Sequence, residues 1–182
     1  MTTTLTTQQI LNLVTLLGKM KNLRRTGWVN RGVKNPESDA DHSFSLAVLA
    51  MFLAPADLDK LKCLQMALIH DMPEIFCGDF MPDQISDIEK NKLETDAMHE
   101  IAHQLRLPQL SDLFAEFEAQ KTPEAKFVKA LDRLDNVLTA KYYQTEQKID
   151  LVEEFAASAR SRIENLDAET RELLQSVLKT LL

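Results

Sequence analysis

The chain has 182 residues, enough for one domain with a substantial core, and 45% hydrophobic and 27% charged residues are ordinary for a globular protein. The formal net charge of −7 argues against polymeric nucleic acid as a partner, because such partners are normally bound by basic surfaces. No apolar run approaches the length of a membrane span, and residues 1–4 lack the basic start of a signal peptide. With Cys63 and Cys77 as the only cysteines, we expect a cytoplasmic protein without a disulfide framework or membrane association.

Glycines are few, and this scarcity favours helices. The four glycines are scattered, so no phosphate-cradling loop of the GxxxxGK or GxGxxG kind is present, and runs of alternating β-branched residues are missing. The sequence therefore predicts an all-α fold, a single helical domain over residues 1–182. Its core spans about residues 10–145, and two further amphipathic helices occupy about 149–182.

The first helix is expected over residues 7–21, with Thr6 or Thr7 as its cap. Apolar residues recur along it at three- and four-residue spacing: Ile10, Leu13, Val14, Leu17 and Met20. The basic, turn-rich stretch 22–36 follows and contains the only tryptophan, Trp28. Two interpretations are open, a solvated loop with Trp28 in the core or a phosphate site with an aromatic wall. The basic residues of the stretch include Arg25, Arg31 and Lys34.

Residues 38–41 have the S-x-x-D form of a capping box and start the next helix, which Pro55 ends. His42 falls in the first turn of this helix. A single histidine near the start of a helix is more often a structural residue than a metal ligand. His42 therefore becomes a candidate ligand only together with other candidate ligands elsewhere in the chain. Asp57 can cap the helix that follows.

That helix runs into a concentration of ionisable groups. Pro73 should end it near His70 and Asp71, since proline disfavours the α conformation of the residue before it. Glu74 and Asp79 follow within the next turns. Burying such groups beside apolar sequence is costly without a cation or partners, so this stretch is the first candidate for a functional site.

The remaining sequence predicts helices only. Their expected ranges are about 87–105, 110–117, a long helix from Pro123, 149–166 and 168–182. The helix from Pro123 carries Asp132 and Asp135 about one turn apart, and periodicity does not choose between them as a site residue.

His99, Glu100 and His103 match H-E-x-x-H, a zinc-protease pattern. The apolar residues of this helix lie on the opposite arc, which places both histidines toward solvent. The longer zinc pattern needs a third histidine where the chain has Gln109. We therefore reject a metalloprotease.

The order His42, His70 with Asp71, and Asp132 resembles the H…HD…D pattern of the HD-domain metal-dependent phosphohydrolases. Further segments resemble the 5′-deoxynucleotidase branch of that family over about residues 10–145: 25–28, 36–38, 41–42, 70–74, 78–79 and 124–132. The chain departs from bacterial relatives where Gly27, rather than an arginine, precedes Trp28.

The resemblance implies an HD-domain helical bundle that hydrolyses (deoxy)nucleoside 5′-monophosphates to nucleoside and phosphate, usually as a homodimer. It implies that His42, His70, Asp71 and Asp132 hold one divalent cation, which could be manganese, cobalt, iron, zinc or magnesium. It also implies catalytic roles for Glu74 and Asp79, leaving open which is the acid.

The resemblance also implies a substrate site, in which Arg25 and Arg31 would bind the phosphate and Trp28 would pack on the sugar or base. The alternatives are an HD hydrolase of another phosphate ester, such as a nucleoside triphosphate or cyclic dinucleotide, and a non-catalytic binding or regulatory module.

Overall fold

The computed structural model describes residues 5–81 and 84–182, so residues 1–4 and the end of the expected loop at Pro82 lie outside it. The described residues form helices and no strand, which confirms the all-α prediction. Arg24 and Ser38 form an isolated backbone bridge. No helix within the described ranges is long and apolar enough to cross a membrane.

The chain forms two compact units, each described by itself. The first contains Met1–Ser43 and Ile69–Ala115, and the second contains Phe44–Leu68 and Glu116–Leu182. Helices of the first unit are α1 (Thr7–Asn22), α2 (Thr26–Val29), α5 (Glu74–Cys77) and α6 (Asp87–Leu105). Helices of the second are α8 (Pro123–Gln147), α9 (Val152–Ile163) and α10 (Ala168–Leu181). The residues of α3 (Asp39–Leu53), α4 (Lys60–Ile69) and α7 (Gln109–Ala119) are divided between the units. A single domain over residues 1–182 stays a prediction.

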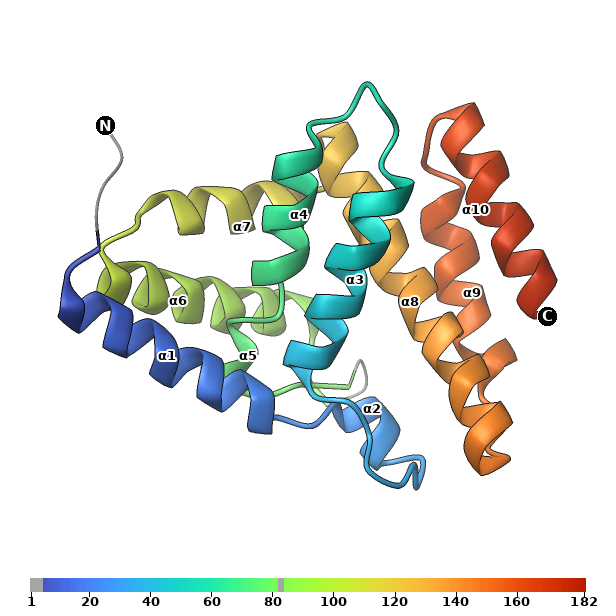
Figure 1. The fold of residues 1–182 in the computed structure, drawn as a ribbon, viewed down its shortest axis with the longest axis horizontal. Helices are drawn as coiled ribbons and strands as arrows, with labels where there is room; N and C mark the ends of the chain where they lie inside the picture. The colour runs from blue at the N-terminus through green and yellow to red at the C-terminus, as the bar shows by residue number, and fades with distance from the viewer. Residues whose placement is uncertain (1–4, 82–83) are drawn as a thin grey trace. The chain divides into compact units, whose positions relative to one another are not determined.

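In the first unit, α1 packs against α5 and α6 (Figure 1). A capping box between Thr6 and Gln9 starts α1, as the expected cap at Thr6 requires. The core of this unit is apolar and comes from four helices and the turn before α5: Leu16, Met20, Ile69, Met72, Met98, Ile101, Leu105 and Phe114.

The buried face of α1 differs from the expected apolar stripe. Met20 is buried, but Ile10, Val14 and Leu17 are exposed. Gln9 is buried instead, and its side-chain amide donates to the backbone carbonyl of Leu105 at the end of α6. The last carbonyls of a helix have no partner within that helix. The rotation of α1 about its axis therefore depends on this contact with the end of α6 as well as on the apolar residues of α1.

Replacing Ile101 with alanine is expected to lower the free energy of unfolding by about 2–5 kcal/mol, because the side chain is fully buried in this core. Ile88 lies on the same helix with 85% of its surface exposed, so Ile88→Ala is the matched control and should change stability by less than about 0.5 kcal/mol. Urea unfolding followed by circular dichroism measures both. Equal effects of the two substitutions would contradict this packing.

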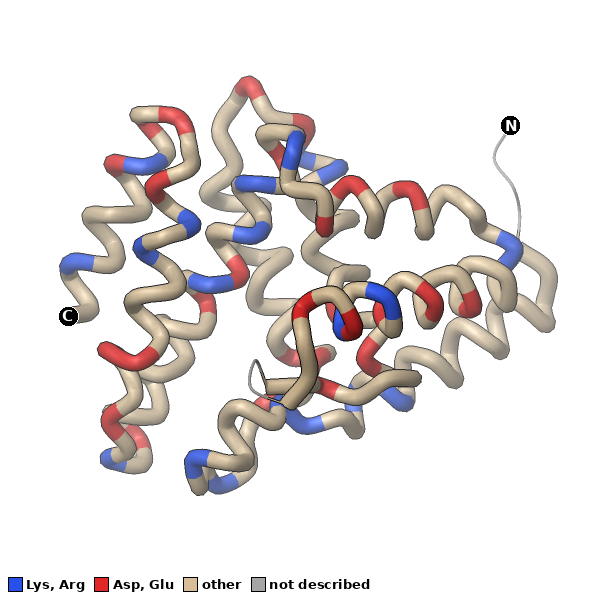
Figure 2. Tube along the Cα trace, turned by 180° about the vertical axis from the view of Figure 1, so that it is seen from behind, with Lys and Arg blue, Asp and Glu red and all other residues tan. Residues whose placement is uncertain are grey.

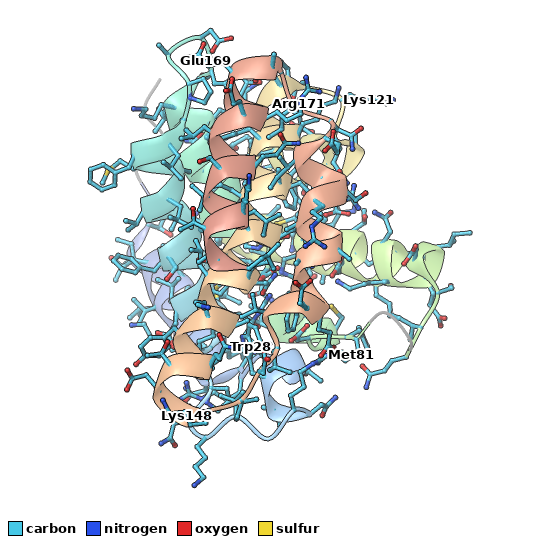
Figure 3. The ribbon with its side chains drawn as sticks, turned by 90° about the vertical axis from the view of Figure 1, so that its right-hand side faces the viewer. Trp28, Met81, Lys121, Lys148, Glu169 and Arg171 are labelled. Atoms are coloured by element: carbon cyan, nitrogen blue, oxygen red, sulfur yellow. The ribbon has the colours of Figure 1, made fainter. Side chains whose placement is uncertain are left out.

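In the second unit, α8 packs against α9 and α10 (Figure 1). Thr122 caps α8 through the amide of Ala125, and Pro123 occupies the first turn as expected. Lys148 ends α8 in the left-handed conformation and projects outward (Figure 3). Acidic and basic residues are interspersed along the helices (Figure 2).

Candidate metal centre

The start of α3 holds His42 in place. The Ser38 hydroxyl accepts from the Asp41 amide at 3.2 Å, and the Asp41 carboxylate accepts from the Ser38 amide at 2.9 Å. This reciprocal pair is the expected capping box, and it fixes His42 in the first helical turn. The His42 side chain is fully buried.

The turn between α4 and α5 presents the second group of side chains. Helix α4 ends at Ile69, and the Met72 amide then donates to the Ile69 carbonyl at 3.0 Å. Pro73 precedes the short helix α5, whose first residue is Glu74. The helix therefore ends before Pro73, as expected, whereas α5 was not predicted. His70 and Asp71 of this turn and Glu74 at the start of α5 are all buried.

His42, His70 and Asp71 converge. The His70 Nε2 lies 3.1 Å from Asp71 Oδ1, and His42 Nε2 lies 3.8 Å from Asp71 Oδ2. The two imidazole rings meet edge to face with centroids 5.2 Å apart. Two imidazole nitrogens and a carboxylate thus face one another in a buried place, which is the donor chemistry of a transition-metal site.

Arg25 reaches the same carboxylate. Its guanidinium donates to Asp71 Oδ2 at 2.7 Å, and about a tenth of each side chain is exposed. Burial opposes ionisation of Asp71, but the charges of His70 and Arg25 outweigh it and hold the pKa of Asp71 below its ordinary value. Asp71 is therefore a carboxylate that stays ionised.

Two more buried carboxyl groups lie beside Asp71. One oxygen from each of Asp39, Asp71 and Glu74 lies within 4.8 Å of the others. Burial, followed by the charge of Asp71, raises the pKa of Asp39 to about 8. Burial, with Asp71 and Asp79, raises the pKa of Glu74 well above its ordinary value. In the absence of a cation, these two groups resist ionisation because like charges crowd them.

Asp39 and Lys90 were not singled out in the sequence. Asp39 lies inside the capping-box pattern, which assigns a role to Ser38 and Asp41 but none to the two residues between them. Lys90, on α6, lies 3.7 Å from Glu74 Oε1 and also pairs with Glu94. The signal available for Lys90 was its four-residue spacing from Glu94 in a helix, which predicts a pair but not a site.

The remaining candidates of the first unit have structural contacts. Asp79 accepts from the Thr26 amide at 2.6 Å and so caps α2. Trp28 is 1% exposed and donates its indole N–H to Glu37 at 2.8 Å, the position expected of a core residue. Arg31 donates to the Gly27 carbonyl at 2.7 Å, within its own turn. Arg25, from the same stretch, contacts the Asp71 carboxylate directly.

Asp132 and its rival Asp135 belong to α8 and are both buried. Arg133 Nε lies 3.8 Å from Asp132 Oδ2, and the Asn136 side chain donates to the Asp132 carbonyl at 3.1 Å. Burial alone does not separate the two aspartates.

A divalent cation fits the residues of the first unit. Imidazole nitrogens and carboxylate oxygens are suitable donors, and the imidazoles of His42 and His70 lie 3.8 and 3.1 Å from the Asp71 carboxylate. Buried polar atoms in proteins normally have a hydrogen-bond partner or an ion. In the described part of the chain, both Asp39 carboxylate oxygens and Glu74 Oε2 have no hydrogen-bond partner, which fits a nearby cation.

The two histidines of the H-E-x-x-H pattern differ from His42 and His70 in their exposure to solvent. His99 and His103 are exposed on α6, while Met98, Ile101 and Leu105 of the same helix are buried. The double substitution His99→Ala/His103→Ala is therefore expected to leave metal binding by the protein unchanged. Elemental analysis of metal-loaded protein checks this, and loss of metal from the double variant would support the zinc-protease pattern instead.

The family model described as HD domain matches residues 17–173 of the chain. The chain belongs to the HD-domain family. The membership expected from the motifs is therefore confirmed, and the matched range includes His42, His70, Asp71 and Asp132.

Relatives of this HD domain have names that state an activity. The chain is 38% identical over 160 residues to the human protein named 5′-deoxynucleotidase HDDC2, covering 85% of this chain and 78% of that protein. It is 40% identical over 164 residues to the Dictyostelium discoideum protein of the same name, covering 81% and 86%. A solved structure of a conserved hypothetical protein from Pyrococcus furiosus is 30% identical, covers 94% of this chain and 98% of that one, and superposes with a TM-score of 0.80.

Proposed function

We propose that this protein is a metal-dependent phosphomonoesterase that hydrolyses (deoxy)nucleoside 5′-monophosphates to nucleoside and inorganic phosphate. The observation that carries the proposal is the convergence of His42, His70 and Asp71, with Arg25 on the same carboxylate. The relatives named 5′-deoxynucleotidase, similar over most of the chain, support the reaction type.

His42, His70, Asp71 and Asp132 are the proposed ligands of one divalent cation. When bound, such a cation supplies Lewis-acid chemistry, because it draws charge from phosphate oxygens and makes a coordinated water more acidic. Asp71 suits this position since Arg25 and His70 keep it ionised. Arg25 also sets a permanent positive charge where the phosphate dianion would lie, and guanidinium groups bind phosphate oxygens in pairs.

The reaction requires two proton transfers. The water gives up one proton as its oxygen forms a bond to phosphorus. The bond from phosphorus to the 5′ oxygen breaks, and that oxygen takes up a proton as it leaves, so the products are nucleoside and hydrogen phosphate. Glu74 and Asp79 are the proposed groups for orienting water and supplying the proton. Burial and the charges of Asp71 and Asp79 raise the pKa of Glu74, which is the direction that suits a general acid. Asp79, bonded to Thr26, is positioned by α2.

Substrate contacts in this proposal come from the α2 region. Arg25 and Arg31 are the candidates for phosphate, and Trp28 for the sugar or base. Trp28 is buried and donates its indole N–H to Glu37, a contact that supports the turn beside Arg25 and would have to open for Trp28 to meet a substrate.

The test is phosphate release from a panel of esters by chelator-treated protein, before and after single divalent metals are added. Metal-dependent release from deoxynucleoside monophosphates is expected, with ribonucleotides, a triphosphate and a cyclic dinucleotide as comparisons. Release confined to the triphosphate or the cyclic dinucleotide would replace the monophosphate substrate with another ester. No release by metal-bound protein would favour the non-catalytic alternative.

Two further properties belong to the proposal. Homodimer formation follows from the resemblance and is tested by light scattering of the purified chain. A cytoplasmic location, without polymeric nucleic acid as partner, follows from the composition and from the free thiols of Cys63 and Cys77.

A further inference from the structure

Lys90 is a charged residue to which the proposed reaction gives no role, and it lies against one of the two proposed catalytic carboxyl groups. Lys90 belongs to α6, which packs against α5, the short helix that begins at Glu74. Its Nζ lies 3.7 Å from Glu74 Oε1. The Glu74 side chain is 5% exposed, so solvent and salt screen this pair far less than a surface pair.

Lys90 is itself held in place by a second carboxylate. Its ammonium group donates to Glu94, one turn further along α6, and Glu94 is buried. Burial opposes ionisation of Lys90, but the charges of Glu74 and Glu94 outweigh it and raise the pKa of Lys90. Lys90 is therefore a cation with a defined position, unlike a lysine that extends into solvent.

The contact with Lys90 distinguishes the two oxygens of the Glu74 carboxyl group. An ammonium group has N–H donors and no acceptor, so the oxygen that faces it, Oε1, can only accept. Oε2 is buried and has no hydrogen-bond partner among the described residues. A proton on this carboxyl group thus belongs on Oε2, which is the oxygen available to a water molecule or a leaving group.

The orientation of Glu74 matters because proton transfer requires heavy atoms about 2.6–3.2 Å apart. A displacement of about 1 Å can lower a rate about 10²-fold. We propose that Lys90 is a positioning residue, which fixes the Glu74 carboxyl group through Oε1 and so presents Oε2 to the reacting groups. The inference rests on the proposed function for the role of Glu74. The competing explanation is that Lys90 only offsets the charge of buried carboxylates and stabilises the fold.

Lys90→Met keeps a linear side chain and removes the charge. It should lower kcat for a deoxynucleoside monophosphate by about 10–100-fold, with KM and metal content unchanged. Lys90→Arg keeps the charge and should restore most of kcat. Lys92→Met is the matched control, because Lys92 lies on the same helix with 78% of its side chain exposed and pairs with Asp96 at the surface. It should keep full kcat.

A double-mutant cycle with Glu74→Gln separates positioning from stabilisation. In the Glu74→Gln background, Lys90→Met should lower kcat no further, since the group that Lys90 positions is already gone. Equal losses in both backgrounds, or an unchanged kcat in Lys90→Met alone, would overturn the positioning role. Circular dichroism monitors folding, and Lys90→Gln takes the place of Lys90→Met in the cycle if the latter does not fold.

The same cycle measured by thermal unfolding does not depend on activity. Non-additive shifts in Tm are expected, because residues in direct contact are coupled. Non-additive shifts without release of phosphate from any ester would support the hold of Lys90 on Glu74 and remove the proposed reaction. Additive shifts in a protein that releases phosphate from nucleoside monophosphates would do the reverse.

Discussion

Asp71→Asn is expected to remove the cation bound by the histidine group and the phosphatase activity together. Asp71 is the carboxylate on which His42, His70 and Arg25 converge, at 3.8, 3.1 and 2.7 Å. Stabilisation of charge by a metal ion contributes several kcal/mol to the transition state, and each 1.4 kcal/mol is tenfold in rate. Turnover should therefore fall by at least about 10³-fold.

Asparagine is chosen because it keeps the volume and can still accept the hydrogen bond from Arg25. The variant is expected to fold, and circular dichroism with thermal unfolding provides that control. Metal content by elemental analysis and phosphate release from a deoxynucleoside monophosphate are measured on the same sample. A folded Asp71→Asn protein with unchanged metal and activity would show that the proposed ligands are wrong.

Glu74→Gln is expected to separate metal binding from catalysis. The histidine-bound cation should remain, since Glu74 is not among its proposed ligands. Activity should fall by about 10²–10⁴-fold, the usual contribution of a general acid or base. Glutamine keeps the size of the buried side chain, and Lys90 retains its pair with Glu94, so the local packing should persist.

Glu89→Gln, at an exposed position on the first turn of α6, is the control and should keep full activity. The measurements are phosphate release at saturating metal and the number of ions per chain. At least one ion is expected in Glu74→Gln. Full activity would reduce Glu74 to a structural residue, and complete loss of metal would make it a ligand of the proposed cation.

Local sequence patterns determined the helices and the order of the site residues. Three- and four-residue spacing, the caps at Thr6 and Thr122, and the scarcity of glycine were sufficient for an all-α fold. Pro73 located the end of the helix near His70 and Asp71, since its effect on the backbone is local. The H…HD…D order was sufficient for the family, because its motifs are read directly from the chain.

Only the tertiary structure decided which side chains meet. Asp39 lies about 30 residues before Asp71 and Glu74, and the capping-box pattern that contains it describes contacts of its own turn. The rotation of α1, with Gln9 buried and Val14 exposed, depends on the end of α6. Periodicity reports neighbours within one helix, whereas distances between helices depend on packing of the whole core. The helices and their motifs thus follow from the sequence, and the carboxylate cluster follows from the packing.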